Sequence, residues 1–135
     1  MNGGDFLAII TAAVAAFIIS GLWYSPLLFG RQWLALRGIN AEAFADKKMP
    51  AGTMITEFAR TLIIAFVLTH FIVITGTTGV LGALSLAVWI WVGFYAMILV
   101  GSVIHDKVSW KLAAIRAGDG LVRIIVMTII ISIWK

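Results

Sequence analysis

Four apolar stretches, separated by short polar segments, dominate the hydropathy pattern of the chain. They cover about residues 6–28, 54–75, 80–103 and 117–134. A helix needs roughly 20 apolar residues, rising 1.5 Å each, to cross the hydrocarbon core of a bilayer. The pattern therefore predicts an all-α, polytopic membrane protein, folded as a four-transmembrane-helix bundle in a single domain over residues 1–135.

The end of the first stretch combines aromatic rings, a proline and the first positive charge. Pro26 removes the helical hydrogen bond to the Leu22 carbonyl, so we expect the first helix to be kinked or broken there. The freed carbonyl must find another partner, because lipid offers none. Amphipathic rings followed by a cation are typical of a helix that leaves a bilayer. This candidate motif consists of Trp23, Tyr24, Ser25, Pro26, Arg31 and Trp33.

Small and aromatic side chains predict how the helices pack. Ala12, Ala16 and Ser20 share one face of the first helix, and small residues in such a row let another helix approach closely. The middle of the third stretch is rich in rings, which are Trp89, Trp91, Phe94 and Tyr95. Because Trp and Tyr usually lie at membrane interfaces, we expect these rings to pack against the small-residue face. The alternative is an aromatic wall that stacks on a ligand.

Composition and charge support a membrane location. The chain is 62% apolar and 12% charged, whereas soluble domains average about 25% charged residues. It has no cysteine, which excludes disulfides and thiolate metal sites. The segments 30–53 and 105–117 carry most of the basic residues, so the positive-inside rule predicts that both are cytoplasmic loops and that both termini lie outside. A net charge of +4 is explained by these loops, and no nucleic-acid partner is expected.

Three short motifs resemble a known family. The Trp-Tyr-Ser-Pro-Leu-Leu-Phe-Gly run of residues 23–30, followed by Arg31 and Trp33, resembles the domain of unknown function 1761, a family of small bacterial integral membrane proteins. Residues 91–94 and 111–118 resemble later landmarks of that family. The resemblance implies a multi-pass protein of the bacterial inner membrane. It implies no activity.

The residues that could carry chemistry do not form a catalytic set. His70 and His105 should differ in depth by roughly 20 Å, so they cannot share one ion in a monomer. Glu57 is the only acid inside a predicted span, but it is too near the inner surface for a mid-membrane proton relay. No fingerprint of a hydrolase, metalloprotease or nucleotide-binding protein occurs. We therefore expect no cofactor, no metal and no enzymatic activity.

Two pairs of opposite charges form the best candidate site. Glu57 and Arg60 are three residues apart on the second helix, and Asp119 and Arg123 are four apart on the fourth, at a similar depth. One interpretation is an ion network that satisfies itself near the headgroups. The other is a pocket for an anionic lipid headgroup, because basic residues outnumber acids there. His70 should lie within the hydrocarbon and face the bundle interior, either hydrogen-bonded or functional.

Three functions remain open from these patterns. The favoured one is a non-enzymatic packing or interaction protein in the lipid bilayer, as a homo-oligomer or with another membrane protein. The alternative is a small-solute transporter or channel, with a path lined by residues among Glu57, Arg60, His70, Trp91 and Tyr95. The least favoured is a lipid-binding or lipid-modifying protein at the inner face.

Overall fold

A computed structural model describes residues 3–25, 28–38 and 51–134, and all regular elements in these ranges are helices. They are α1 (Gly3–Trp23), α2 (Gly30–Leu36), α4 (Ala51–Thr75), α5 (Gly79–Ile90), the π-helix η1 (Trp91–Ala96), α6 (Met97–Asp106) and α7 (Trp110–Ile133). Because α5, η1 and α6 follow one another without a break, they act as one long helix. The prediction of an all-α protein is confirmed for the described residues.

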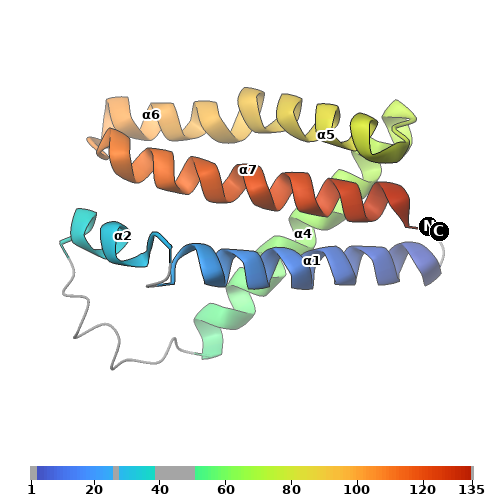
Figure 1. Cartoon of the computed structure of the whole chain (residues 1–135), viewed down its shortest axis with the longest axis horizontal. Helices are drawn as coiled ribbons and strands as arrows, with labels where there is room; N and C mark the ends of the chain where they lie inside the picture. The colour runs from blue at the N-terminus through green and yellow to red at the C-terminus, as the bar shows by residue number, and fades with distance from the viewer. Residues whose placement is uncertain (1–2, 26–27, 39–50, 135) are drawn as a thin grey trace.

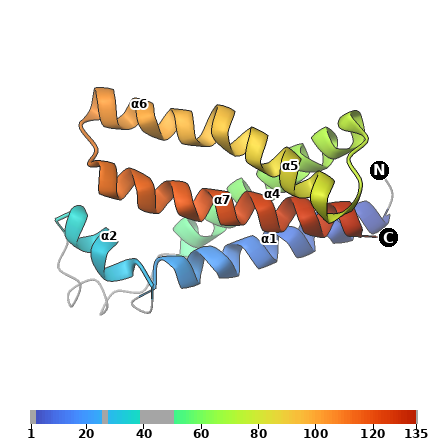
Figure 2. The same cartoon turned by 45° about the horizontal axis from the view of Figure 1, so that its top comes forward.

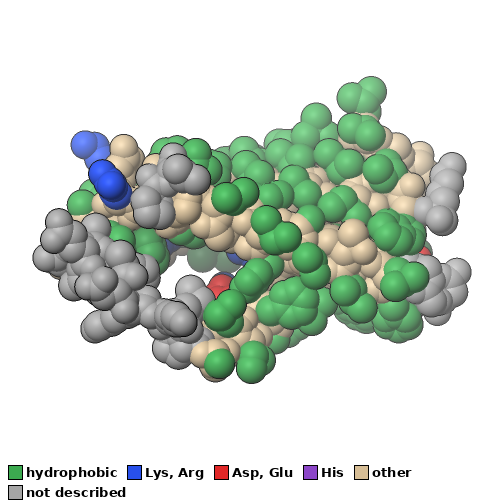
Figure 3. Space-filling model, turned by 60° about the horizontal axis from the view of Figure 1, so that its bottom comes forward, with side chains coloured by type: hydrophobic (Ala, Val, Ile, Leu, Met, Phe, Trp, Pro, Cys, Tyr) green, Lys and Arg blue, Asp and Glu red, His purple; other side chains and the backbone are tan. Residues whose placement is uncertain are grey.

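The polar helix α7 lies in the middle of the bundle. It packs against α1 on one side and against the α5–η1–α6 helix on the other, while α4 crosses behind α1 and α7 at an angle (Figures 1 and 2). The start of α1, the α4–α5 turn and the end of α7 lie at one end of the molecule. The other end holds α2 and the α6–α7 link, and we call it the basic end because Lys and Arg side chains are exposed there (Figure 3). The two predicted loop regions thus lie at the same end.

Small residues allow the helices to approach closely. Ala12, Ala13 and Ala16 of α1 are completely buried, as are Ala65 of α4 and Ala87 of α5. The predicted packing face of the first helix is therefore buried. It contacts α7 and α4, and Trp91 and Tyr95 of the third helix are partly buried against the same core cluster that contains Ala12, Ala13 and Ala16. Small side chains serve this purpose because lipid tails supply no hydrophobic drive between helices, so close van der Waals contact must hold them together.

Three helices are long and apolar enough to cross a membrane: Asp5–Trp23, Ala51–Thr75 and Gly79–Asp106. By length and composition, the described residues therefore contain three candidate membrane spans and not the predicted four. The helix that fails is α7, whose 24 residues include Lys111, Arg116, Asp119 and Arg123. The rest of the surface fits a lipid environment, since hydrophobic side chains cover most of the face seen in Figure 3.

The first helix ends earlier than predicted. α1 stops at Trp23, whereas the predicted span continued to residue 28, so the helix is broken rather than kinked. Pro26 itself lies outside the described residues. The Leu22 carbonyl does find a new partner: the Ser25 N–H donates to it at 3.1 Å and the Ser25 hydroxyl at 2.7 Å. Ser25 thus satisfies the acceptor that the proline was expected to free.

The predicted cytoplasmic loop at 105–117 is wrong over most of its length. Only residues 107–109 link α6 to α7, because Ser109 caps the next helix by accepting the Leu112 N–H at 3.1 Å. The fourth helix therefore starts at Trp110, seven residues before the predicted start at 117. In the other predicted loop, residues 30–36 form α2, and residues 39–50 lie outside the described residues.

Candidate functional site: a buried charge pair on α7

Asp119 of α7 lies at the centre of the candidate site and is only 3% exposed. The Ser20 hydroxyl of α1 donates a hydrogen bond to Asp119 Oδ1 at 2.8 Å, and the Tyr24 hydroxyl also hydrogen-bonds this carboxylate. Arg123 Nη1 lies 3.9 Å from Asp119 Oδ2, one helical turn away. A carboxylate in apolar surroundings is tolerated only when it is paired and hydrogen-bonded. All three partners lie near the end of α1 or on α7 itself.

Arg123 connects the same site to α4. Its Nη2 donates to the Thr61 hydroxyl at 2.7 Å, and this hydroxyl in turn donates to the Glu57 carbonyl at 2.9 Å. The Arg123 side chain is 12% exposed, and its Nε is buried without a hydrogen-bond partner. One guanidinium group therefore connects Asp119 of α7 to Thr61 of α4, and its buried Nε has no partner among the described residues.

Two tryptophans hold the adjacent turn of α7 from opposite helices. Trp23 of α1 donates its indole N–H to the Ile115 carbonyl, and Trp91 of η1 donates to the Ala117 carbonyl, each at 2.9 Å. These bonds are available because carbonyl oxygens have a second lone pair beyond the helical hydrogen bond. The turn that carries Asp119 is thereby fixed to both neighbouring helices.

The two glycines beside Asp119 make room for aromatic rings. A Cβ atom on Gly118 would lie 2.6 Å from Cζ2 of Trp23, and one on Gly120 would overlap the Tyr95 ring. Trp91 and Tyr95 both belong to η1, the π-helix that interrupts the long third helix. Such π-helical turns are rare and occur often at functional sites. Gly118 and Gly120 thus each contact an aromatic ring, and the buried Asp119 lies between them in the sequence.

The remaining motif residues after α1 fold back over this site. The Gly30 N–H donates to the Ser25 carbonyl at 2.9 Å, and a Cβ on Gly30 would lie 2.7 Å from the Ser25 carbonyl oxygen. This tight reversal puts Trp33 against the Tyr24 ring, with centroids 4.9 Å apart. Arg31 is exposed on α2.

Glu57 and Arg60 form a second pair on the surface of α4. Arg60 Nη1 lies 2.6 Å from Glu57 Oε1, and the two side chains are 61% and 41% exposed for Arg60 and Glu57 respectively. The charges of Arg60 and Arg123 both act on the Tyr95 hydroxyl, and the charge of Glu57 acts on Asp119. The four predicted charged residues therefore lie in one region, although the two pairs are bonded separately.

His70 does not face the bundle interior, so that prediction is wrong. It is exposed on α4, and its ring centroid lies 6.5 Å from that of Phe71. The neighbouring Thr69 is the buried polar residue, and its hydroxyl donates to the Ala65 carbonyl at 2.9 Å. The buried face of α4 therefore includes Ala65 and Thr69, and His70 lies outside it. Within the described ranges, no three His, Asp or Glu side chains converge in a way that could hold a metal ion.

Sequence reasoning missed the partners of the charge pair. The pattern of small residues places Ser20 only in a packing row, and it assigns no role to Thr61. The signal for both was their polarity on otherwise buried helix faces, since a buried hydroxyl indicates a nearby hydrogen-bond partner. Gly118 and Gly120 were available as a signal too, because glycine inside a helix costs about 1 kcal/mol and indicates close packing.

Comparison with known proteins supports the resemblance seen in the motifs. A family model described as a protein of unknown function (DUF1761) matches residues 7–132, nearly the whole chain. No curated protein and no solved structure matches.

We predict that each charge of the buried Asp119–Arg123 pair is tolerated only when the other charge is present. Asp119→Leu leaves a buried guanidinium without its counter-charge, which should lower the free energy of unfolding by about 3–5 kcal/mol. Adding Arg123→Met should recover most of that loss, because both charges are then gone. Thermal unfolding in detergent measures both effects. The exposed pair supplies the control, since Glu57→Gln should cost less than about 1 kcal/mol. A double variant no more stable than Asp119→Leu would contradict the prediction.

We also predict that Gly120 is required for the contact with η1. Gly120→Ala should lower the free energy of unfolding by about 1–3 kcal/mol, because the new methyl group overlaps the Tyr95 ring. Gly101→Ala is the matched control: its Cβ meets open space, so helix propensity should make it neutral or stabilising. Tyr95→Leu in the Gly120→Ala background should restore part of the lost stability in the same unfolding assay. Equal effects of the two glycine substitutions would count against the contact.

Proposed function

The chain belongs to the DUF1761 family of proteins of unknown function, and we propose that it is a multi-pass protein of the bacterial inner membrane that works by packing. In this role it forms a homo-oligomer or a subunit of a larger membrane complex, and it catalyses no reaction. The proposal combines three parts: the number of membrane crossings, their orientation and the surface that contacts the partner.

The proposed number of crossings is four, with α7 as an internal span. Its 24 residues rise about 36 Å, enough to cross the hydrocarbon core. Charged residues inside a membrane usually face the bundle interior and pair with one another. Asp119 and Arg123 meet both conditions, because α1, α4 and the third helix surround them. The burial of Asp119 and Arg123 supports a membrane crossing by α7, although the composition of α7 alone argues against one.

The proposed orientation places the basic end in the cytoplasm. Arg31, Arg37, Lys107 and Lys111 are exposed at that end. The α4–α5 turn at the opposite end, residues 76–78, has no charge. Positively charged segments next to spans remain on the cytoplasmic side. With four crossings, the start of α1 and the end of α7 are then both outside.

The observation that carries the packing proposal is an exposed aromatic surface in the middle of the third helix. Trp89 is 75% exposed and Phe94 is 65% exposed, and a Cβ on Gly93 between them would meet open space. These residues lie near the centre of the apolar span Gly79–Asp106. Tryptophan is enriched at membrane interfaces rather than at mid-depth, and an exposed glycine allows a second helix to approach. A second copy of the chain is the partner we propose for this surface.

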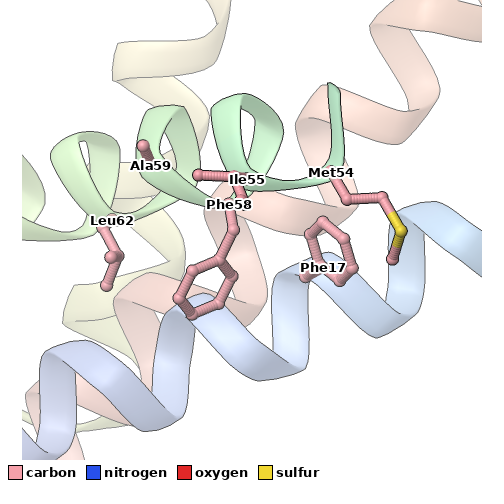
Figure 4. A pocket seen from close by; sticks show the side chains of 6 residues that line it. All are labelled: Phe17, Met54, Ile55, Phe58, Ala59 and Leu62. Carbon is pink, nitrogen blue, oxygen red and sulfur yellow. The ribbon is translucent and has the colours of Figure 1, made fainter. Parts of the chain in front are cut away.

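The transport alternative has less support from the same geometry. Trp91 and Tyr95 are used in contacts with α7, while His70 lies on the outside of α4. The residues expected to line a path therefore do not face a common space. A groove of about 410 Å³ between α1 and α4 is lined by Phe17 and by apolar residues of α4 (Figure 4). An apolar groove of this kind favours lipid contact over passage of a polar solute.

The topology can be tested by cysteine labelling, since the natural chain has no cysteine. In intact cells, a membrane-impermeant maleimide should label Thr78→Cys and Trp134→Cys, because both lie at the end opposite the basic end. Lys111→Cys, at the basic end, should react only after the membrane is permeabilised. Labelling of Lys111→Cys and Trp134→Cys on the same side would show that α7 does not cross, and recovery of the protein in the soluble fraction would contradict the membrane placement.

The packing role can be tested by native mass spectrometry of the protein extracted with surrounding lipid. We expect a discrete oligomer for the natural chain. Gly93→Leu fills the space between the exposed rings and should shift the population to monomer, about tenfold or more. Gly21→Leu is the matched control, because Gly21 is an exposed glycine of α1 whose Cβ also meets open space. A natural chain that is monomeric and has no co-purifying protein would contradict the proposal.

A further inference from the structure

A second cleft lies between α4 and the third helix. These two helices diverge from the turn that joins them, and α7 runs beneath the gap (Figures 1 and 2). An apolar hollow of about 200 Å³ occupies this gap and is lined by Ile63, Ile64, Val67, Leu68, Phe71, Ile90 and Ile124. We call it the α4–α5 cleft. All its lining side chains are aliphatic or aromatic, so its interior suits a hydrocarbon chain.

The cleft leads toward a cationic region at the basic end. Arg60 precedes Ile64, Val67 and Phe71 by four, seven and eleven residues, which places all four on the same face of α4. The Arg60 side chain is 61% exposed despite its bond to Glu57. The apolar row of the cleft therefore ends, toward the basic end, at an accessible guanidinium group.

The floor of the cleft adds to this cationic region. Arg123 precedes Ile124 of the cleft floor, and its Nε is buried with no partner among the described residues. Its Nη2 donates to the hydroxyl of Thr61, the residue after Arg60. Two guanidinium groups therefore lie close together at this end of the cleft, Arg60 exposed and Arg123 largely buried.

We propose that the α4–α5 cleft binds one anionic phospholipid, with an acyl chain along Ile64, Val67 and Phe71 and the phosphate at Arg60. Arg123 supplies a second positive charge beneath it. The ligand must be amphipathic because the site is: an apolar hollow and a cationic end share one face of α4. Basic residues near a membrane surface attract anionic headgroups by their charge. The site takes its lipid from the leaflet at the basic end.

Charge distinguishes this cleft from the other groove of the molecule. Both hollows are lined by apolar side chains, and the groove between α1 and α4 is the larger of the two. The α4–α5 cleft differs because its row of Ile64, Val67 and Phe71 continues on the same face of α4 to Arg60. This arginine, with Arg123 beside the cleft floor, provides the selection for an anionic headgroup. The inference rests on the membrane placement proposed above. Cysteine labelling tests that placement separately, so a failure of lipid selectivity and a failure of topology can be told apart.

The test compares phosphatidylglycerol with phosphatidylcholine of the same acyl chains, each added to the purified full-length protein in detergent. Native mass spectrometry then measures the lipid-bound fraction. We expect one phosphatidylglycerol to bind at least fivefold more tightly than phosphatidylcholine, and Arg60→Gln to lower this preference about fivefold. Lys111→Gln is the matched control, since it removes an exposed charge at the same end but outside the cleft. It should leave the preference unchanged.

A second pair of variants tests the apolar part of the site. Val67→Trp fills the cleft and should reduce binding of both lipids by tenfold or more, whereas Val73→Trp, on the exposed side of the same helix, should not. Unfolding temperatures without added lipid show that each variant is folded. Equal binding of the two lipids would overturn the proposal, as would equal effects of Arg60→Gln and Lys111→Gln. The proposal would also be overturned if inorganic phosphate alone stabilised the protein as much as phosphatidylglycerol does. A dimer crosslinked through position 67 would overturn it as well.

Discussion

The structure depends on one constraint: Asp119 and Arg123 lie on a central helix, away from water, and must be satisfied from within the bundle. Each neighbouring segment contributes to this. Ser20 and Tyr24 come from the end of α1, and Thr61 comes from α4. A buried ion pair adds little net stability compared with apolar residues, but breaking it is costly. The pair therefore specifies how α1, α4 and α7 are arranged relative to one another, more than it stabilises the fold.

The rest of the core is arranged around this requirement. Polar contacts need short distances, and alanines on α1, α4 and α5 let the helices come close enough to form them. On α7, Gly118 and Gly120 bring Trp23 and Tyr95 against the backbone beside Asp119. The result is an inverted distribution of polarity, in which the most charged helix is inside and the three apolar helices surround it. Such an arrangement suits a solvent that is itself apolar.

The two proposed functions use different surfaces of this scaffold. The outer side of the third helix, with Trp89 of α5 and Phe94 of η1, is available to a second chain, while the inner side of η1 is occupied by α7. The α4–α5 cleft lies on another face and ends at the same charged region that holds the core together. A lipid bound there would contact Arg60 and Arg123 and would add to the connection between α4 and α7. Lipid binding and oligomer formation can thus occur on one molecule at the same time.

The sequence by itself determined the helical class, the positions of three apolar helices and the break after the first one. Each follows from local physics: hydropathy over about 20 residues sets a span, and Pro26 with Ser25 sets the break. Only the tertiary structure decided that α7 is central and that His70 faces outward. These depend on which partners meet across helices. The Trp91 indole in the π-helical turn likewise hydrogen-bonds to the Ala117 carbonyl, 26 residues away. No local sequence pattern encodes that contact.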